Sequence, residues 1–167
     1  GDTFSQRDKW IHSNLKALYQ KHNPMFHSQI IHNINFVMID NSAFEITQEQ
    51  LAFFREQVGR GLPIILSMHI PVYLPGHNID YGCGHPDWNR DNDIYYEIER
   101  REPWPEKGFT ETTYQFRDMV LNSPEVIGIY AGHTHEEAID FFNDKLQYVT
   151  AANYSNKDIL IHFIPAD

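Results

Sequence analysis

The fold is decided by the stretch PIILSMHIP, which spans residues 63–71. Its first six residues form a short, nearly continuous apolar run, which is typical of a parallel strand buried on both faces. A second run of this kind, VIGIYAGHTH, spans residues 126–135. The first run ends at His69, and the second ends at His133 and His135, after a glycine that allows a tight turn. Because ligands in open α/β sheets bind beyond the carboxyl ends of the strands, we expect these imidazoles at one edge of one sheet.

The segments around these two runs predict an α/β fold. Residues 34–40 read as another buried strand, and the capping-box pattern that begins at Thr47 opens an apolar stripe at helical spacing that ends near Gly59. Residues 111–122 predict a second helix, closed by Asn122-Ser123-Pro124. We further expect a helix at 3–22, a short strand at 28–32, and antiparallel strands at 137–142, 146–151 and 158–164 with a turn at Asn143-Asp144.

The two histidine motifs resemble those of the calcineurin-like metallophosphoesterases. In that family an apolar strand ends in a metal-binding histidine, often followed by Ile-Pro, and a later strand leads into Gly-His-x-His. SMHIP at residues 67–71 and GHTH at residues 132–135 match both motifs in this order. The strand that ends at Asp40-Asn41-Ser42 is similar to the family's preceding strand. The resemblance covers roughly residues 30–165 and implies the C-terminal part of a layered α/β sandwich, with a mixed sheet and antiparallel C-terminal strands.

The resemblance also implies a chemistry and its ligands. In the intact enzyme His69 and His133 would bind the second of two divalent ions and His135 the first. Imidazole ligands suit Zn, Fe, Mn, Ni or Co and do not choose among them. Such a pair of ions activates a hydroxide that hydrolyses a phosphomonoester or a phosphodiester. The implied protein is therefore a hydrolase whose substrate is a small phosphoester or a phosphoprotein.

The family's earlier motifs, Asp-x-His, Gly-Asp and Gly-Asn-His, do not occur in these 167 residues. The remaining metal ligands and the general-acid histidine of the family belong to those motifs. We therefore expect no catalytic residue within residues 1–167, and we interpret them as a single domain that forms the C-terminal portion of a longer enzyme. Without its N-terminal half as a partner, this portion should bind metal weakly or not at all.

We expect residues 71–110 to form a cap that covers the histidine site. Forty residues between a strand and the next helix is a long connection, and connections of this length usually have a function. The segment leaves directly from the strand that ends at His69, and it is rich in aromatic residues. The expected substrate-binding residues in this insertion are Tyr81, His85, Trp88 and Arg90. The alternative is a surface subdomain that packs on itself and contacts no substrate.

Composition excludes several classes of function. The net charge of −10 argues against a nucleic-acid partner, because phosphate contacts require a basic surface. No apolar stretch reaches the length of a membrane span. Cys83 is the only cysteine, so no intrachain disulfide forms, and the compartment stays open between periplasm and cytoplasm.

Two other functions fit the same motifs. One is a non-catalytic binding or scaffold domain that kept the fold and lost the other ligands. The other is a mononuclear zinc hydrolase built on His69, His133 and His135 alone. Among the remaining polar residues, we expect His27 to be structural and Asp40-Asn41 to form a turn or cap.

Overall fold

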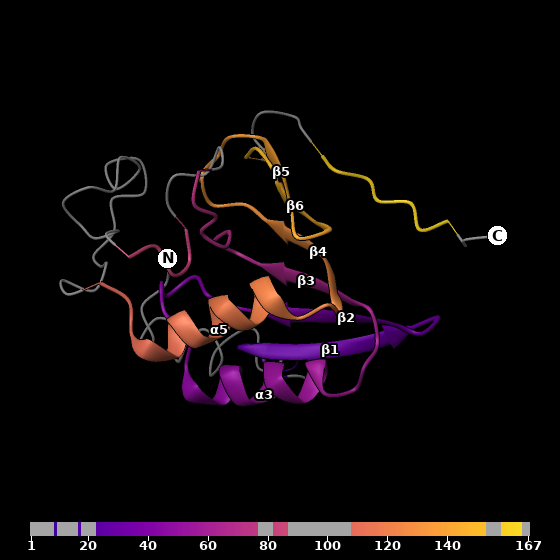
Figure 1. Ribbon diagram of the computed structural model, residues 1–167, viewed down its shortest axis with the longest axis horizontal. Helices are drawn as coiled ribbons and strands as arrows, with labels where there is room; N and C mark the ends of the chain where they lie inside the picture. The colour runs from indigo at the N-terminus through magenta and orange to yellow at the C-terminus, as the bar shows by residue number, and fades with distance from the viewer. Residues whose placement is uncertain are drawn as a thin grey trace.

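In the described part of the chain, the computed structural model contains a six-stranded mixed sheet and two helices with defined bounds (Figure 1). The structure describes residues 9, 17, 23–76, 82–86, 108–152 and 158–164. The strands are β1 (Phe26–Ile31), β2 (Ile34–Ile39), β3 (Ile64–Met68), β4 (Val126–Ala131), β5 (Ala138–Phe142) and β6 (Lys145–Val149), in the spatial order β1-β2-β3-β4-β6-β5. This confirms the predicted α/β class. Of the helix predicted at residues 3–22, only Lys9 and Ala17 are described, and both are helical, so the bounds of this helix stay a prediction.

The centre of the sheet is parallel, as the sequence predicts. β3 lies between β2 and β4 and pairs with both in the parallel sense. Leu66 of β3 is fully buried beside Val37 of β2 and Ile129 of β4, its register partners. Because the three strands run in one direction, their carboxyl ends share one edge, and His69 and His133 leave the sheet at that edge.

Two helices cover one face of the sheet. α3 (Gln48–Val58) begins with the predicted capping box between Thr47 and Gln50, and α5 (Glu111–Asn122) begins at Thr110. The Glu45 carboxylate accepts hydrogen bonds from Thr110 and Thr113 and so fixes the first turn of α5. Neither helix in the described part of the chain has the length and hydrophobicity needed to cross a membrane.

The apolar core lies between this face and the helices. Phe54 of α3 and Phe116 of α5 are fully buried, and their ring centroids are 4.9 Å apart. Both rings belong to the same buried cluster as Val37, Leu66 and Ile129. Alternate residues of each central strand therefore face the helices, which is the two-layer packing that amphipathic helices on a sheet require.

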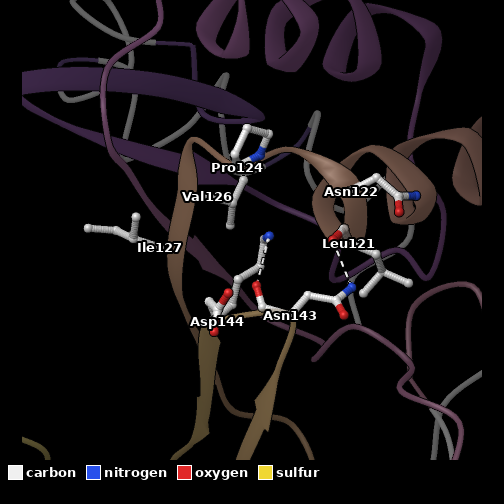
Figure 2. A pocket seen from close by; sticks show the side chains of 8 residues that line it. Leu121, Asn122, Pro124, Val126, Ile127, Asn143 and Asp144 are labelled. Carbon is white, nitrogen blue, oxygen red and sulfur yellow. Dashed lines mark hydrogen bonds between the residues drawn. The ribbon is translucent and has the colours of Figure 1, made fainter.

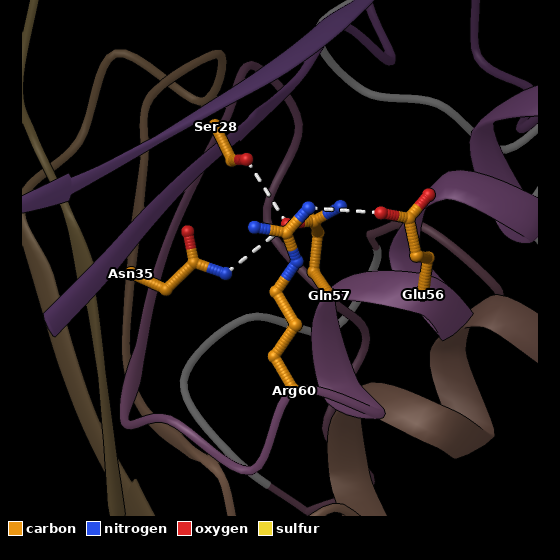
Figure 3. A network of polar contacts seen from close by, with 5 residues as sticks. All are labelled: Ser28, Asn35, Glu56, Gln57 and Arg60. Atoms are coloured by element: carbon orange, nitrogen blue, oxygen red, sulfur yellow. Dashed lines mark hydrogen bonds and ion pairs between the residues drawn. The ribbon is translucent and has the colours of Figure 1, made fainter. Parts of the chain in front are cut away.

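A buried glutamine links α3 to β1 and β2 by hydrogen bonds. Gln57 Oε1 accepts hydrogen bonds from Ser28 Oγ on β1, at 3.0 Å, and from Asn35 Nδ2 on β2, at 3.2 Å (Figure 3). Near it, on the exposed surface of the helix end, Arg60 pairs with Glu56 at 2.8 Å. The Gln57 contacts join one helix to two strands and lie at the end of β2 opposite to the carboxyl edge.

The C-terminal strands differ in part from the prediction. β5 and β6 pair antiparallel around Asn143 and Asp144, both with positive φ, so the predicted turn is confirmed. However, β6 inserts between β4 and β5 and runs parallel to β4.

The strand predicted at residues 158–164 is wrong. Within the described ranges, residues 158–164 pair with no strand, and Leu160 and Ile164 are 80 % and 84 % exposed. Its alternating apolar residues gave the strand signal, but a strand also requires a neighbour with which to form hydrogen bonds. The segment instead contacts the sheet through Phe163, whose ring meets the Phe36 ring edge-on at a centroid distance of 5.4 Å.

The face of the sheet away from the helices carries a row of large side chains. Tyr130 of β4 and Tyr148 of β6 are register partners whose rings stack at 5.4 Å, and Ile139 of β5 continues the row. Phe141, two residues further along β5, is 61 % exposed, and Ile139 is also exposed. We call these four residues the outer row. Exposed apolar side chains that gather on one face are typical of a surface that another element covers.

Candidate functional site

His69 and His133 come together at the carboxyl edge of the sheet. The Nε2 atom of His69 lies 3.2 Å from Nδ1 of His133, and their ring centroids are 5.0 Å apart. His133 is buried, with the ring of Phe44 against it at a centroid distance of 5.7 Å. The two strand ends are also joined through the main chain, because Gly132 N donates to His69 O at 3.0 Å. The predicted convergence of these two histidines is confirmed.

The loop after β4 holds its histidines in an unusual backbone conformation. His133 and His135 have φ of 71° and 60°, whereas a side chain at Gly132 would meet only ordinary contacts. The expectation that Gly132 supplies the tight turn is therefore wrong, and the left-handed conformation falls on the histidines. This conformation costs a non-glycine residue about 1–2 kcal/mol. Strain of this kind persists where the surroundings fix it, and it gathers at functional sites.

Asn41 holds the turn that carries His69. Its Oδ1 accepts hydrogen bonds from His69 N at 2.9 Å and from Ile70 N at 2.8 Å, and its Nδ2 donates to Ile70 O at 2.9 Å. The side chain is fully buried. The turn expected at Asp40-Asn41 is present, because Phe44 N donates to Asn41 O at 2.9 Å, and the hydrogen bonds of the Asn41 side chain also reach residues 28 and 29 positions ahead. The signal for them was the position of a carboxamide at the end of a strand beside the one that ends at His69.

The first residues of the insertion are fixed by a second buried carboxamide. Gln147 of β6 accepts from Val72 N at 2.8 Å and donates to Val72 O at 3.0 Å. A later segment of the insertion, at Cys83, then pairs with its first residues. Cys83 N donates to Pro71 O, and Tyr73 N donates to Cys83 O. The base of the insertion is thus a rigid continuation of the His69 turn. No sequence pattern distinguishes Gln147 from any other inward-facing residue of a strand.

The thiol of Cys83 is buried within this base. Burial raises the pKa of Cys83 to about 12, against a hydrogen bond to the Asn41 side chain, which lowers it. We therefore expect this thiol to be unreactive at neutral pH, because the thiolate is the reactive form.

The buried thiol predicts a loss of stability in alkali. In the unfolded chain the thiol releases its proton near pH 9, while in the folded chain it keeps the proton until about pH 12. The stabilisation is fully present below pH 9 and is lost as the pH rises toward 12. Between pH 8 and 10, we expect wild type to lose about 1 kcal/mol more unfolding free energy than Cys83→Ala. Urea unfolding of both proteins under reducing conditions measures this difference, and equal losses would contradict the prediction.

A cavity of about 290 Å³ adjoins His69. Its polar lining residues include His27 of β1 and Asp40, which follows β2. His27 was expected to be structural, and its place at this cavity had no local signal because the β1–β2 pairing brings it there. The register sets His27 opposite Met38, which also lines the cavity. The site thus has an accessible space beside one of its two paired imidazoles.

The other predicted site residues are placed less completely. His85 lies at the base of the insertion with its ring on Tyr73, at a centroid distance of 4.1 Å, and the Arg117 guanidinium lies over the same tyrosine. Tyr81, Trp88 and Arg90 lie outside the described residues. Within the described ranges, no three His, Cys, Asp or Glu side chains are arranged to hold a metal ion. His135 therefore does not join the other two histidines in one metal-binding group, contrary to the expected gathering of all three.

The paired imidazoles fit two ligands of one metal ion. Two nitrogens bound tetrahedrally at roughly 2.0–2.1 Å are about 3.3 Å apart, and the nitrogens of His69 and His133 are 3.2 Å apart. Neutral imidazole is a good ligand for several divalent metals. These two residues would hold the ion, and further ligands would have to come from elsewhere.

A second cavity, of about 340 Å³, lies at the opposite edge of the sheet, between the end of α5 and the β5–β6 turn (Figure 2). Lys145 lines this cavity, and its Nζ lies 3.5 Å from the Asn143 carbonyl oxygen. The carboxyl end of a helix carries partial negative charge, which favours this cation and disfavours a bound anion. The phosphate chemistry that the motifs predict thus has no counterpart at this cavity.

Neither a protein-family model nor a curated protein sequence matches this chain. The motifs and the geometry of the histidine pair therefore carry the functional proposal.

Proposed function

We propose that this chain is the C-terminal portion of a metal-dependent phosphoesterase with a metallophosphoesterase-type layered sandwich. The observation that carries the proposal is the pairing of His69 and His133, with nitrogens at the spacing of two ligands on one ion. The motif resemblance assigns these two residues to the same ion and His135 to the other. Among the described residues these three histidines do not form one metal-binding group, which does not favour a mononuclear zinc site on all three.

The division of work between protein and metal follows from the site. When bound, two divalent ions supply a hydroxide nucleophile at neutral pH and neutralise charge on the phosphoryl group. The protein holds the imidazoles at the sheet edge through the main-chain bond between Gly132 and His69. The insertion begins two residues after His69 and is proposed to contact the rest of the substrate. Phosphate esters, as small molecules or on a protein, are the substrate class.

The outer row is evidence that a further part of the protein covers the face of the sheet away from the helices. Ile139 and Phe141 expose apolar surface beside the stacked Tyr130 and Tyr148. A second sheet packed on this face would bury that surface, as in two-sheet sandwiches. In the proposed enzyme this second layer is the N-terminal half, which also brings the carboxylate and amide ligands.

The proposal is tested by comparing residues 1–167 with the protein expressed from its upstream coding sequence. The longer protein is expected to hold about two divalent ions per chain and to hydrolyse para-nitrophenyl phosphate or its bis-ester. The shorter chain is expected to bind metal weakly and to show negligible turnover, because too few ligands are present. Elemental analysis and initial rates measure both.

The competing function is a non-catalytic binding or scaffold domain. A longer protein that holds no metal and turns over neither ester would support it and overturn the proposal. Two tightly bound ions and turnover in residues 1–167 alone would also overturn the division proposed above, because the ligands would then come from other residues of this chain.

A further inference from the structure

Asn41 uses both polar atoms of its carboxamide to hold the turn that carries His69. Its oxygen accepts from the two successive main-chain N–H groups of His69 and Ile70, and its nitrogen donates to the Ile70 carbonyl oxygen. The side chain also lowers the pKa of the Cys83 thiol, which lies in the returning segment of the insertion. An amide oxygen has two acceptor positions, and both are used here.

This arrangement places one side chain at the junction of three elements. Asn41 itself follows β2, the His69 turn follows β3, and Cys83 belongs to the base of the insertion. The main-chain N–H of His69 is thereby fixed at one end, and the carbonyl of His69 is fixed at the other by Gly132. Because the peptide units on both sides of the His69 Cα are held, the Cα–Cβ bond of His69 leaves the sheet in one direction.

We infer that Asn41 is a positioning residue that sets the His69 imidazole against His133 and couples the insertion to that pair. The inference rests on the proposed function for its consequence in metal binding, but the geometry that it predicts is measurable without metal. A carboxamide that positions a ligand through the main chain acts like the outer partners of metal sites, whose loss typically lowers metal affinity about 10–100-fold.

The test compares Asn41→Ala with Gln57→Ala in this chain. Gln57 is an equally buried carboxamide whose contacts, to Ser28 and Asn35, lie at the other end of the sheet (Figure 3). Both substitutions should lower the midpoint of thermal unfolding. Only Asn41→Ala should change the imidazole ¹H–¹⁵N correlations of His69 and His133 in the metal-free protein. A Zn²⁺ titration followed through the same signals should show at least about tenfold weaker binding for Asn41→Ala and no change for Gln57→Ala.

Asn41→Asp serves as the conservative rescue, because its carboxylate can still accept from the two main-chain N–H groups. It should keep the imidazole signals closer to wild type than Asn41→Ala does. If Asn41→Ala does not fold, Asn41→Ser is measured in its place, since its shorter hydroxyl cannot span both N–H groups.

The outcomes separate the inference from the proposed function. A folded alanine or serine variant with wild-type imidazole signals overturns the positioning role, even if wild type binds Zn²⁺. Altered imidazole signals in that variant support the positioning role whether or not the wild-type chain responds to Zn²⁺, whereas a longer protein that holds no metal counts against the proposed function. Equal perturbation of the histidine signals by Gln57→Ala would also overturn the inference, because the effect would then be a general loss of packing.

Discussion

His133→Ala in the longer protein is expected to remove bound metal and to lower kcat by at least about 100-fold on every phosphoester. Outer partners of metal ligands already contribute about 10–100-fold to affinity or activity, and loss of a ligand should cost at least as much. The truncation leaves His69 without the imidazole that now lies 3.2 Å from it. Metal content by elemental analysis and kcat on several esters measure the effect.

Two variants show whether the loss is specific to the site. His162→Ala replaces an exposed histidine of the C-terminal segment and should leave metal content and kcat unchanged. Trp88→Ala, in the insertion proposed to be a cap, should change KM or substrate preference more than metal content, because contacts made equally in ground and transition states leave kcat unaltered. A His133→Ala enzyme that retains two ions and its activity would contradict the assignment of this histidine.

The largest effect on stability is expected from Phe54→Ala, at about 3–5 kcal/mol of unfolding free energy. Phe54 is fully buried against Phe116, and its removal leaves a cavity between the two helices and the sheet. The cost combines lost transfer free energy with the cavity that close-packed neighbours cannot fill. Urea unfolding monitored by far-UV circular dichroism measures it, with the slope of the transition checked for constancy.

Phe141→Ala is the matched control, because it makes the same substitution at an exposed position of β5. In residues 1–167 it should cost less than about 1 kcal/mol, as surface substitutions usually do. In the longer protein the cost should rise if the outer row is covered. Equal costs at Phe54 and Phe141 in this chain would mean that the core does not lie where the structure places it.

The sequence was sufficient for the elements that have a strong local signal. The apolar run before His69, the capping box at Thr47 and the Asn143-Asp144 turn each depend on residues close together in the chain, and each is found where predicted. The shared edge of His69 and His133 followed from the rule for parallel strands. These inferences needed no knowledge of which side chains meet.

Contacts between distant residues could not be predicted in the same way. The strand order around β6, the bonds of Asn41 to the His69 turn and the place of His27 all depend on pairing across the sheet. At residues 158–164 a clear local pattern gave a wrong prediction. The apolar residues alternate as in a strand, but none of the described strands pairs with them. The left-handed backbone at His133 and His135 also has no local signal, because the sequence pattern assigns such a conformation to the neighbouring Gly132.

The bonds between Gln147 and Val72 have a consequence for the order of assembly. During synthesis Val72 leaves the ribosome 75 residues before its hydrogen-bonding partner. Until β6 has been made and has inserted beside β4, the main-chain groups of Val72 lack the partner that they have in the finished sheet. Hydrogen bonds between residues so far apart in sequence form late in folding, because closing the long loop between them costs conformational entropy. The histidine edge should therefore be the last part of the domain to mature, and nascent chains that stop before residue 147 should carry an unfinished site.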